Sequence, residues 1–231
     1  MTSDEAREVS VFEALATRKA IRAFLPTPVS RAAVEMILTA ASRAPSGSNT
    51  QPWKVQVLAG SVRDGLCTRL VHAFDMNEPG HGDDYQYYSE QWFEPYQARR
   101  RKLGFGLYDS LGIGRDDHER RRVQLGRNYL FFDAPVGMIF TIDRRHGMSA
   151  WIDLGGFLQS IMLAARGLGL HTCPQQAFAR YHRLIREHLQ LPDTDIVVCG
   201  MALGYADPAS PENRLQVERE PLDQFAAFHW S

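Results

Sequence analysis

Residues 44–53 read Ala44-Pro45-Ser46-Gly47-Ser48-Asn49-Thr50-Gln51-Pro52-Trp53 and separate a helical pattern from the first predicted strand. The stretch holds two prolines, one glycine and five small polar or amide side chains. This composition is typical of a loop that presents backbone N–H groups and side-chain amides to a ligand. An ordinary helix-to-strand connection with turn residues explains it equally well. Other residues of the chain are needed to distinguish these two interpretations.

A basic segment precedes this loop. Arg18-Lys19-Ala20-Ile21-Arg22 carries three cations in five residues. Such a run is most often a solvated surface. Here Ile21 and Phe24 alternate with the cations, so we expect them to anchor the segment to the core. Anchored guanidinium groups of Arg18 and Arg22 are well placed to hold a phosphate, which arginine binds with charge-assisted and often bidentate hydrogen bonds.

Hydrophobic periodicity predicts alternating helices and strands. Ser30 suits the beginning of one helix, and Gly167 and Gly169 suit the end of another. The helix over 150–168 is apolar nearly all round, which predicts burial in a large core or at a dimer interface. A short polar loop is expected at Cys173–Gln176. The expected helices cover 11–17, 30–41, 62–74, 116–131, 150–168 and 184–189, and the expected strands cover 53–57, 135–142 and 196–203.

Residues 75–118 have a different composition. Eight aromatic residues and four cations lie between residues 85 and 108. One interpretation is a helical excursion that packs on itself. The other is a lid that shapes a pocket for a flat, anionic substrate. Single-stranded nucleic acid would also suit aromatics beside arginine, but the neutral overall charge and the nearby acidic residues argue against it. The candidate substrate-binding residues are Tyr88, Trp92, Tyr96, Arg99 and Arg100.

Composition restricts the class of protein. The 231 residues are 44% hydrophobic and 23% charged, with a net charge of −1, so no basic field points to nucleic acid or a membrane surface. The cysteines, Cys67, Cys173 and Cys199, are odd in number and widely spaced, which fits a reducing compartment. Met1–Ser10 is polar, and no apolar run approaches membrane-spanning length. We expect a cytoplasmic protein of one domain, residues 1–231, with a variable insertion at about 75–118 and a C-terminal arm at about 205–231.

Known motifs exclude several chemistries. No GxGxxG follows a strand, no GxSxG surrounds a serine, and there is no P-loop. The histidines show neither HxxxH nor HExxH, so no metal site is predicted. His188 is interpreted as a helix-face or core histidine rather than a catalyst. A solvated basic face on a non-enzymatic binding protein remains one interpretation of what is left.

The two N-terminal motifs resemble those of a known family. Residues 18–24, RKAIRAF, resemble the RRSxRxF opening of the FMN-dependent nitroreductase family, and residues 44–53 resemble its APSSxNxQPW loop. Gly167–Leu170 and Gly204-Tyr205 fit its later landmarks. Within the family, the aromatic insertion and the tail resemble the nitroaromatic, nitrobenzoate-type reductases. Lys19 and Ala20 depart from the family's second arginine and its serine, which predicts somewhat weaker retention of FMN.

The resemblance implies a fold and an activity. The fold is α+β, a three-layer α-β-α sandwich with a central mixed sheet, in an intertwined homodimer with two FMN sites at the interface. The activity is NAD(P)H-dependent reduction of nitroaromatic compounds by a ping-pong cycle on flavin N5, with no catalytic side chain and with NADH or NADPH as donor. A quinone or flavin reductase, or a reductive dehalogenase, is the alternative on the same fold.

The resemblance also implies the cofactor site. Arg18 would bind the phosphate, and the segment through Arg22 would follow the ribityl chain and the ring edge. The loop after Ala44 would reach the flavin of the other subunit, Pro174–Gln176 would flank N5, and Arg214 would add a phosphate contact. The cofactor-binding set is Arg18, Lys19, Ala20, Arg22, Pro45, Ser46, Ser48, Asn49, Gln51, Pro174, Gln175, Gln176 and Arg214.

Overall fold

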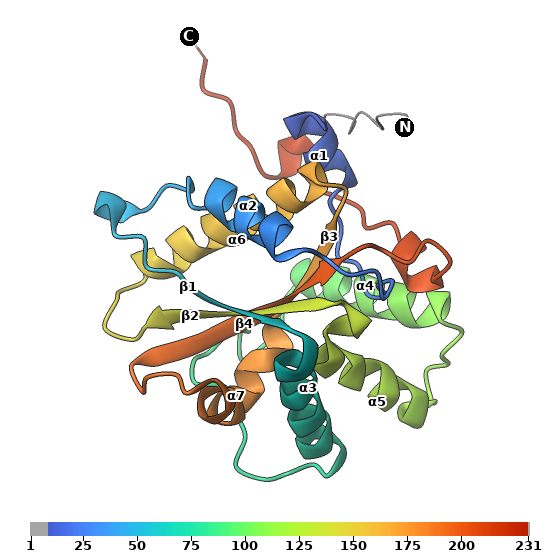
Figure 1. Cartoon of the computed structure of the whole chain (residues 1–231). Helices are drawn as coiled ribbons and strands as arrows, with labels where there is room; N and C mark the ends of the chain where they lie inside the picture. Colours follow the sequence, from blue (N-terminus) through green and yellow to red (C-terminus); the bar gives the residue numbers. More distant parts are fainter. Residues whose placement is uncertain (1–8, 231) are drawn as a thin grey trace, which may run out of the picture.

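A four-stranded sheet lies at the centre of the computed structural model, which describes residues 9–230 (Figure 1). The strands follow the order β1-β2-β4-β3, and each neighbouring pair is antiparallel. A register shift interrupts the β2–β4 pairing between Phe140 and Thr141. The strands are β1 (Lys54–Ala59), β2 (Val136–Asp143), β3 (His171–Gln175) and β4 (Asp195–Gly204).

Helices cover both faces of this sheet (Figure 1). One layer holds α1 (Val11–Thr17), α2 (Arg31–Ala41) and α6 (Ser149–Gly167), and the other holds α3 (Gly60–Asp75), α5 (His118–Gly126) and α7 (His182–Leu189). The remaining helix, α4 (Tyr96–Ser110), lies beside the turn η4. The short 3-10 turns are η1 (Gly47–Asn49), η2 (Arg127–Asp133), η3 (Gln176–Tyr181), η4 (Pro211–Arg214) and η5 (Leu222–Gln224).

Burial of β2 on both faces explains its apolar sequence. Every residue of the strand is buried. Met138 and Phe140 pack into the cluster formed with α2 and α6, whereas Ile139 packs into the cluster formed with α3, η2 and α7. Side chains alternate between the faces of a strand, so a strand with helices on both sides is mostly apolar, and Thr141 and Asp143 are the polar residues of β2. The α+β class is therefore confirmed, with helices on both faces of the sheet.

Helix α2 begins and helix α6 ends where the sequence predicts. The Ser30 side chain accepts the N–H of Ala33 at 3.1 Å and caps α2; such a cap stabilises a helix by about 1 kcal/mol. Gly169, with φ of 71°, follows α6 in the left-handed region that glycine adopts without strain.

The mixed sheet is not found within this chain, because the paired strands are all antiparallel. A parallel pairing exists only as a single bridge between Ala20 and Thr172, among the residues that the structure describes. The bridge lies on the outer edge of β3, where the basic segment passes in an extended conformation. The segment is too short and too irregular to form a further strand.

The predicted loop at Cys173–Gln176 is wrong. Cys173, Pro174 and Gln175 belong to β3 and pair with Ala202, Met201 and Gly200 of β4. A proline usually argues against a strand because it lacks an N–H donor. β3 is an edge strand, and an edge strand tolerates this loss.

The predicted helix over 116–131 is also wrong in its second half. Helix α5 ends at Gly126, and η2 follows with Phe131 and Phe132 at φ of 52°. Left-handed backbone is unfavourable for such bulky residues. Both rings are nevertheless buried, and Phe131 stacks on Phe178 with ring centroids 4.4 Å apart. Burial of the two rings outweighs the local preference.

The insertion and the arm contact each other. Helix α4 has no buried residue. Arg99 forms an ion pair with Glu220 at 2.8 Å, and Lys102 forms one with Glu218 at 2.6 Å. No helix among residues 9–230 is long and apolar enough to cross a membrane. Most of the polar N-terminal stretch lies outside the described residues.

Candidate functional site

The basic segment lies along the free edge of β3. The N–H of Ile21 donates to the carbonyl of Thr172 at 3.1 Å. Ile21 and Phe24 are buried, so the predicted anchoring to the core is confirmed. Arg18 and Lys19 remain partly exposed beside them. The segment therefore presents its cations next to the strand that carries Pro174 and Gln175.

Asn213 joins this segment to the C-terminal arm. Its side-chain oxygen accepts the N–H of Arg22 at 2.8 Å, and its amide nitrogen donates to the carbonyls of Ala23 and Asp207 at 2.8 and 2.9 Å. Its own carbonyl accepts the Lys19 ammonium. A buried side chain whose polar atoms are all paired fixes its neighbours firmly. Arg214 follows Asn213 in the chain, and its guanidinium donates to the carbonyls of Pro208 and Ala209 at 3.4 and 3.2 Å.

A cavity of about 180 Å³ opens between β3, α4 and α5. Gln124 is buried in its wall, and its amide nitrogen has no hydrogen-bond partner among the described residues. A buried donor without a partner is costly and marks a place for a ligand or water. The lining residues are Arg22, Leu107, Tyr108, Gln124, Leu125, Asn128, Phe132, Cys173 and Pro174.

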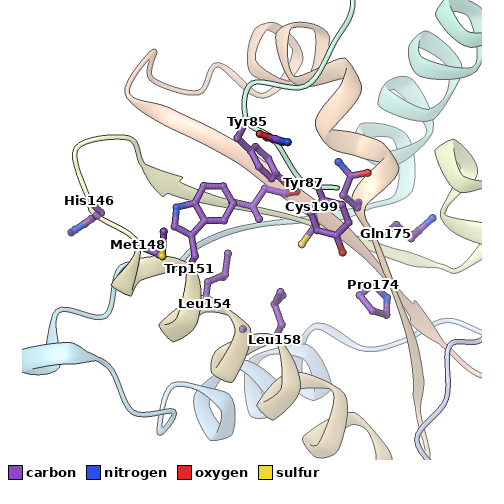
Figure 2. Close-up of a pocket in the computed structure, with 15 residues that line it drawn as sticks. Tyr85, Tyr87, His146, Met148, Trp151, Leu154, Leu158, Pro174, Gln175 and Cys199 are labelled. Carbon is purple, nitrogen blue, oxygen red and sulfur yellow. Dashed lines mark hydrogen bonds between the residues drawn. The ribbon is translucent and has the colours of Figure 1, made fainter. Parts of the chain in front are cut away.

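A larger cavity, of about 650 Å³, lies on the α6 side of the sheet (Figure 2). Trp151, Leu154 and Leu158 rise from α6 toward Tyr85 and Tyr87 of the insertion (Figure 2). This volume is within the range of small-molecule sites. The lining residues are Tyr85, Gln86, Tyr87, His146, Gly147, Met148, Trp151, Leu154, Gly155, Leu158, Pro174, Gln175, Gln176, Val198 and Cys199.

The two cavities share Pro174. Gln175 and Gln176 both line the larger cavity, and the Gln175 side-chain oxygen and the Gln176 amide nitrogen are buried without well-formed hydrogen bonds to residues 9–230. The Gln175 amide nitrogen donates to the carbonyl of Asn128 at 2.7 Å, which links β3 to the wall of the smaller cavity. Unpaired donors and acceptors therefore lie on both sides of one edge strand.

Burial keeps the cysteines neutral. It raises the pKa of the Cys173 thiol to about 11 and that of the Cys199 thiol to about 12. Cys67 is raised to about 11, chiefly by burial. All three are buried and unpaired. A thiolate nucleophile is not available at neutral pH.

The loop at 44–53 has unusual backbone geometry. Ser48, Asn49 and Gln51 have φ between 46° and 58°, the left-handed region. Left-handed backbone outside glycine often marks a functional site. The N–H of Gly47 donates to both carboxylate oxygens of Asp153 on α6, at 3.3 and 3.2 Å.

This loop lies far from the basic segment within one chain. Figure 1 shows it at one end of α6, while the basic segment passes β3 at the other end. The loop is held at Asp153, whereas Arg166 donates to Thr17 at 3.2 Å next to the basic segment. At about 1.5 Å per residue, these two helix positions are roughly 20 Å apart.

The structure thus divides the predicted residues into groups. Arg22, Pro174, Gln175 and Gln176 line cavities, and the bridge at Ala20 and the contacts of Asn213 bring the other basic residues beside them. The loop residues Pro45, Ser46, Ser48, Asn49 and Gln51 form the distant group. The candidate substrate-binding residues Tyr88, Trp92, Tyr96, Arg99 and Arg100 line neither cavity.

The sequence does not predict several of the lining residues. Gln124 and Asn128 are four residues apart, a spacing that places two amides on one face of a helical stretch. This spacing is the feature of the sequence that could have indicated a polar wall. Tyr85 and Tyr87 were recognised only as part of an aromatic cluster. Trp151 begins an apolar helix and gave no separate signal.

The residues fit a flavin phosphate. Cations at Arg18, Arg22 and Arg214 suit the phosphate group. The buried amides of Gln124 and Gln175 offer one unpaired donor and one unpaired acceptor, which is the pair that the carbonyl and N–H edge of a flavin ring requires. A single chain supplies these groups from four separate segments, which are the basic segment, α5, β3 and the arm.

Comparisons with known proteins agree with this geometry. The model of the nitroreductase family matches residues 15–205. A nitrobenzene nitroreductase of Ectopseudomonas oleovorans is 44% identical over 211 residues, covering 91% of this chain and 93% of the relative. A 4-nitrobenzoate reductase of Pseudomonas putida is 44% identical over 215 residues, covering 93% of each chain.

Solved structures are similar over nearly the whole chain. The FMN- and NADPH-dependent nitroreductase NfnB of sphigopyxis sp. strain HMH is 38% identical with a TM-score of 0.93, covering 96% of this chain and 100% of that one. The FMN-dependent NfnB of Mycobacterium smegmatis, solved with NADPH, is 29% identical with a TM-score of 0.90, covering 95% and 97%.

Proposed function

The chain belongs to the nitroreductase family, and from this premise we propose that it is an FMN-dependent oxidoreductase that uses NADPH to reduce nitroaromatic compounds. The observation that carries the proposal is the convergence beside β3. The basic segment pairs with β3 at Thr172 and is joined to the arm by Asn213, and Pro174 of the same strand lines both cavities, beside unpaired buried amides. The relatives named above act on nitrobenzene and 4-nitrobenzoate by their names.

In this proposal the chain binds FMN and orients it toward the nicotinamide and the acceptor. Arg18, Arg22 and Arg214 hold the phosphate, and Gln124 and Gln175 pair with the ring. When bound, FMN supplies the hydride chemistry between nicotinamide and acceptor. Gln176, Tyr85 and Trp151 border the space in which donor and acceptor would alternate. The protein contributes positioning and exclusion of water, which account for much of the rate in such sites.

We also propose a homodimer in which the loop at 44–53 completes the partner's cofactor site. Support comes from the separation of about 20 Å along α6 between the two motifs. Further support comes from exposed apolar side chains on three elements, since large exposed patches mark protein interfaces. They are Phe12 of α1, Met148 and Ile152 near the start of α6, and Phe225, Phe228 and Trp230 of the tail.

We also propose that the chain is one domain, with a variable lid at about 75–118 and an arm at about 205–231 that reaches the partner. If that arm added a strand parallel to the open edge of β1, the sheet would become mixed. The free buried cysteines support a reducing compartment such as the cytoplasm.

The proposal is tested on purified protein. We expect flavin absorbance, or its appearance after FMN is added, and NADPH oxidation that depends on a nitroarene. Quinones and halogenated arenes are assayed in parallel. Failure to bind FMN would contradict the proposal, and a higher kcat/KM for a quinone or a haloarene would replace the nitroaromatic assignment.

A further inference from the structure

We propose that the larger cavity selects uncharged, planar aromatic acceptors and discriminates against acceptors that carry a carboxylate. The inference rests on the proposed function, because it names the class of acceptor that the same site takes. It also separates two activities that the relatives divide between them, since nitrobenzene is neutral and 4-nitrobenzoate is an anion.

The wall of the cavity carries no fixed charge from residues 9–230. Among these residues, no lysine, arginine, aspartate or glutamate lines the cavity. Burial raises the pKa values of Tyr85, Tyr87 and Cys199, so these groups are neutral at neutral pH. His146 is the remaining ionisable group of the lining, and it lies at the end away from Pro174 (Figure 2). An anion would find no fixed countercharge.

The shape of the cavity also suits a planar acceptor. The Tyr85 and Trp151 rings lie with centroids 4.5 Å apart, and Tyr87 meets the Tyr85 ring edge-on at 6.3 Å. The Tyr85 hydroxyl donates to the carbonyl of Val198 at 2.5 Å, which fixes the ring against β4. Aromatic walls above the aliphatic side chains of α6 suit a flat ring.

The end of the cavity near Pro174 is polar. The buried Gln176 amide nitrogen lies near the Tyr85 hydroxyl, and no described residue completes a well-formed hydrogen bond to it. A nitro group accepts hydrogen bonds while carrying no net charge, so it satisfies this donor. A carboxylate is ionised at neutral pH, and burying it without a cation is costly.

The cations that would suit a carboxylate are engaged elsewhere. Arg99 forms an ion pair with Glu220 at 2.8 Å. The Arg100 guanidinium lies over the Trp92 ring, 4.9 Å from its centroid. Neither residue lines the cavity. An anionic acceptor would have to displace one of these contacts to gain a partner.

The experiment compares 4-nitrobenzamide with 4-nitrobenzoate, which are alike in size and differ in charge. Binding to the oxidised, FMN-loaded protein is measured by calorimetry without NADPH, so differences in reduction potential do not enter. We expect the amide to bind at least about tenfold more tightly. Equal binding, or tighter binding of the carboxylate, would overturn the inference. The His146→Gln variant removes the one imidazole of the wall and should keep the preference.

A second arm places a cation in the wall. Gln86 is exposed and lines the cavity, so Gln86→Arg adds a partner for the carboxylate at the rim. We expect the preference for the amide to fall by about threefold. Met36→Arg on α2, exposed and outside the lining, is the matched control and should leave it unchanged. An unchanged preference in Gln86→Arg would show that the acceptor binds elsewhere.

Steady-state assays keep the two proposals distinguishable. If NADPH oxidation depends on neither compound, the proposed function fails. If both are reduced with equal kcat/KM and bind equally, the function stands and the neutral-acceptor inference fails. If the amide is preferred in both binding and kcat/KM, the inference is supported.

Discussion

The N–H of Gly47 is held by the carboxylate of Asp153, with distances of 3.3 and 3.2 Å to its two oxygens. The bond fixes a left-handed loop to α6, and we expect it to position that loop for the cofactor. Asp153→Ala should increase amide hydrogen exchange at Gly47 and weaken FMN binding by about 1 kcal/mol. Asp153→Asn, which keeps an acceptor, should show a smaller effect. Unchanged exchange at Gly47 in Asp153→Ala would contradict this role.

The distance between the loop and the basic segment predicts complementation between subunits. Arg18→Ala and Asn49→Gly should each lower FMN binding and activity; glycine tolerates the φ of 58° at position 49. When the two inactive variants are co-expressed, half of the dimers combine one chain of each kind, and each such dimer has one intact site. About one quarter of all sites should then bind FMN. A site built within one chain would give no recovery.

Replacing Gln124, whose amide nitrogen is unpaired, should change stability and FMN affinity in opposite directions. In the absence of cofactor, Gln124→Met removes a buried donor without a partner, so the free energy of unfolding should stay equal or rise by about 1 kcal/mol. FMN affinity should fall by roughly tenfold, because the ring loses a donor. Gln216→Met, at an exposed position of the arm, is the control. A stabilised variant with full FMN affinity would exclude Gln124 from the cofactor site.

Asn213 should couple stability to cofactor binding. Asn213→Ala leaves the N–H of Arg22 and the carbonyls of Ala23 and Asp207 without their partner. We expect a loss of about 1–3 kcal/mol in urea denaturation and weaker FMN binding, with a smaller effect on kcat at saturating FMN. Loss of stability with unchanged FMN affinity would mean that Asn213 acts on folding alone.

His171 predicts a dependence of stability on pH. Burial, together with Arg166 and Lys19, lowers its pKa to about 4. The unfolded chain, with an ordinary histidine pKa near 6.5, therefore binds more protons than the folded one between about pH 4 and 6.5. Stability should rise with pH through this window and be lost as the pH falls through it.

The matched variants isolate this contribution. His171→Gln should flatten the slope of the free energy of unfolding between pH 4 and 6.5, while His118→Gln, exposed on α5, should keep it. Since the Nε2 atom of His171 lies 2.9 Å from the Arg166 guanidinium, a neutral ring accepts that hydrogen bond. An identical slope in both variants would assign the acid sensitivity to other groups.

Sequence could predict the elements whose local and tertiary preferences agree. The capped start of α2 and the apolar β2 needed no further information. The backbone conformation of Phe131 and Phe132 could not be predicted, because burial of their rings outweighs the local preference of the backbone. Pro174 was misread for a related reason, since an edge position is a property of the whole sheet.

The candidate site follows the same division. The two N-terminal motifs predicted the basic segment and the loop by their resemblance, and their distance within one chain came only from the structure. The insertion has no periodicity that distinguishes Tyr85 and Tyr87 from Tyr88 and Trp92. Which aromatic ring reaches a cavity depends on the path of an irregular segment, and no local rule fixes that path.

The three buried thiols can be used to measure local opening of the protein. Cys67 lies on α3, Cys173 on the edge strand β3 and Cys199 on β4. A buried thiol of raised pKa is modified only when its surroundings open. The rate of alkylation at each position therefore measures a different opening. Mass spectrometry of the three peptides would compare how fast β3 opens with how fast α3 and β4 open, without any introduced label.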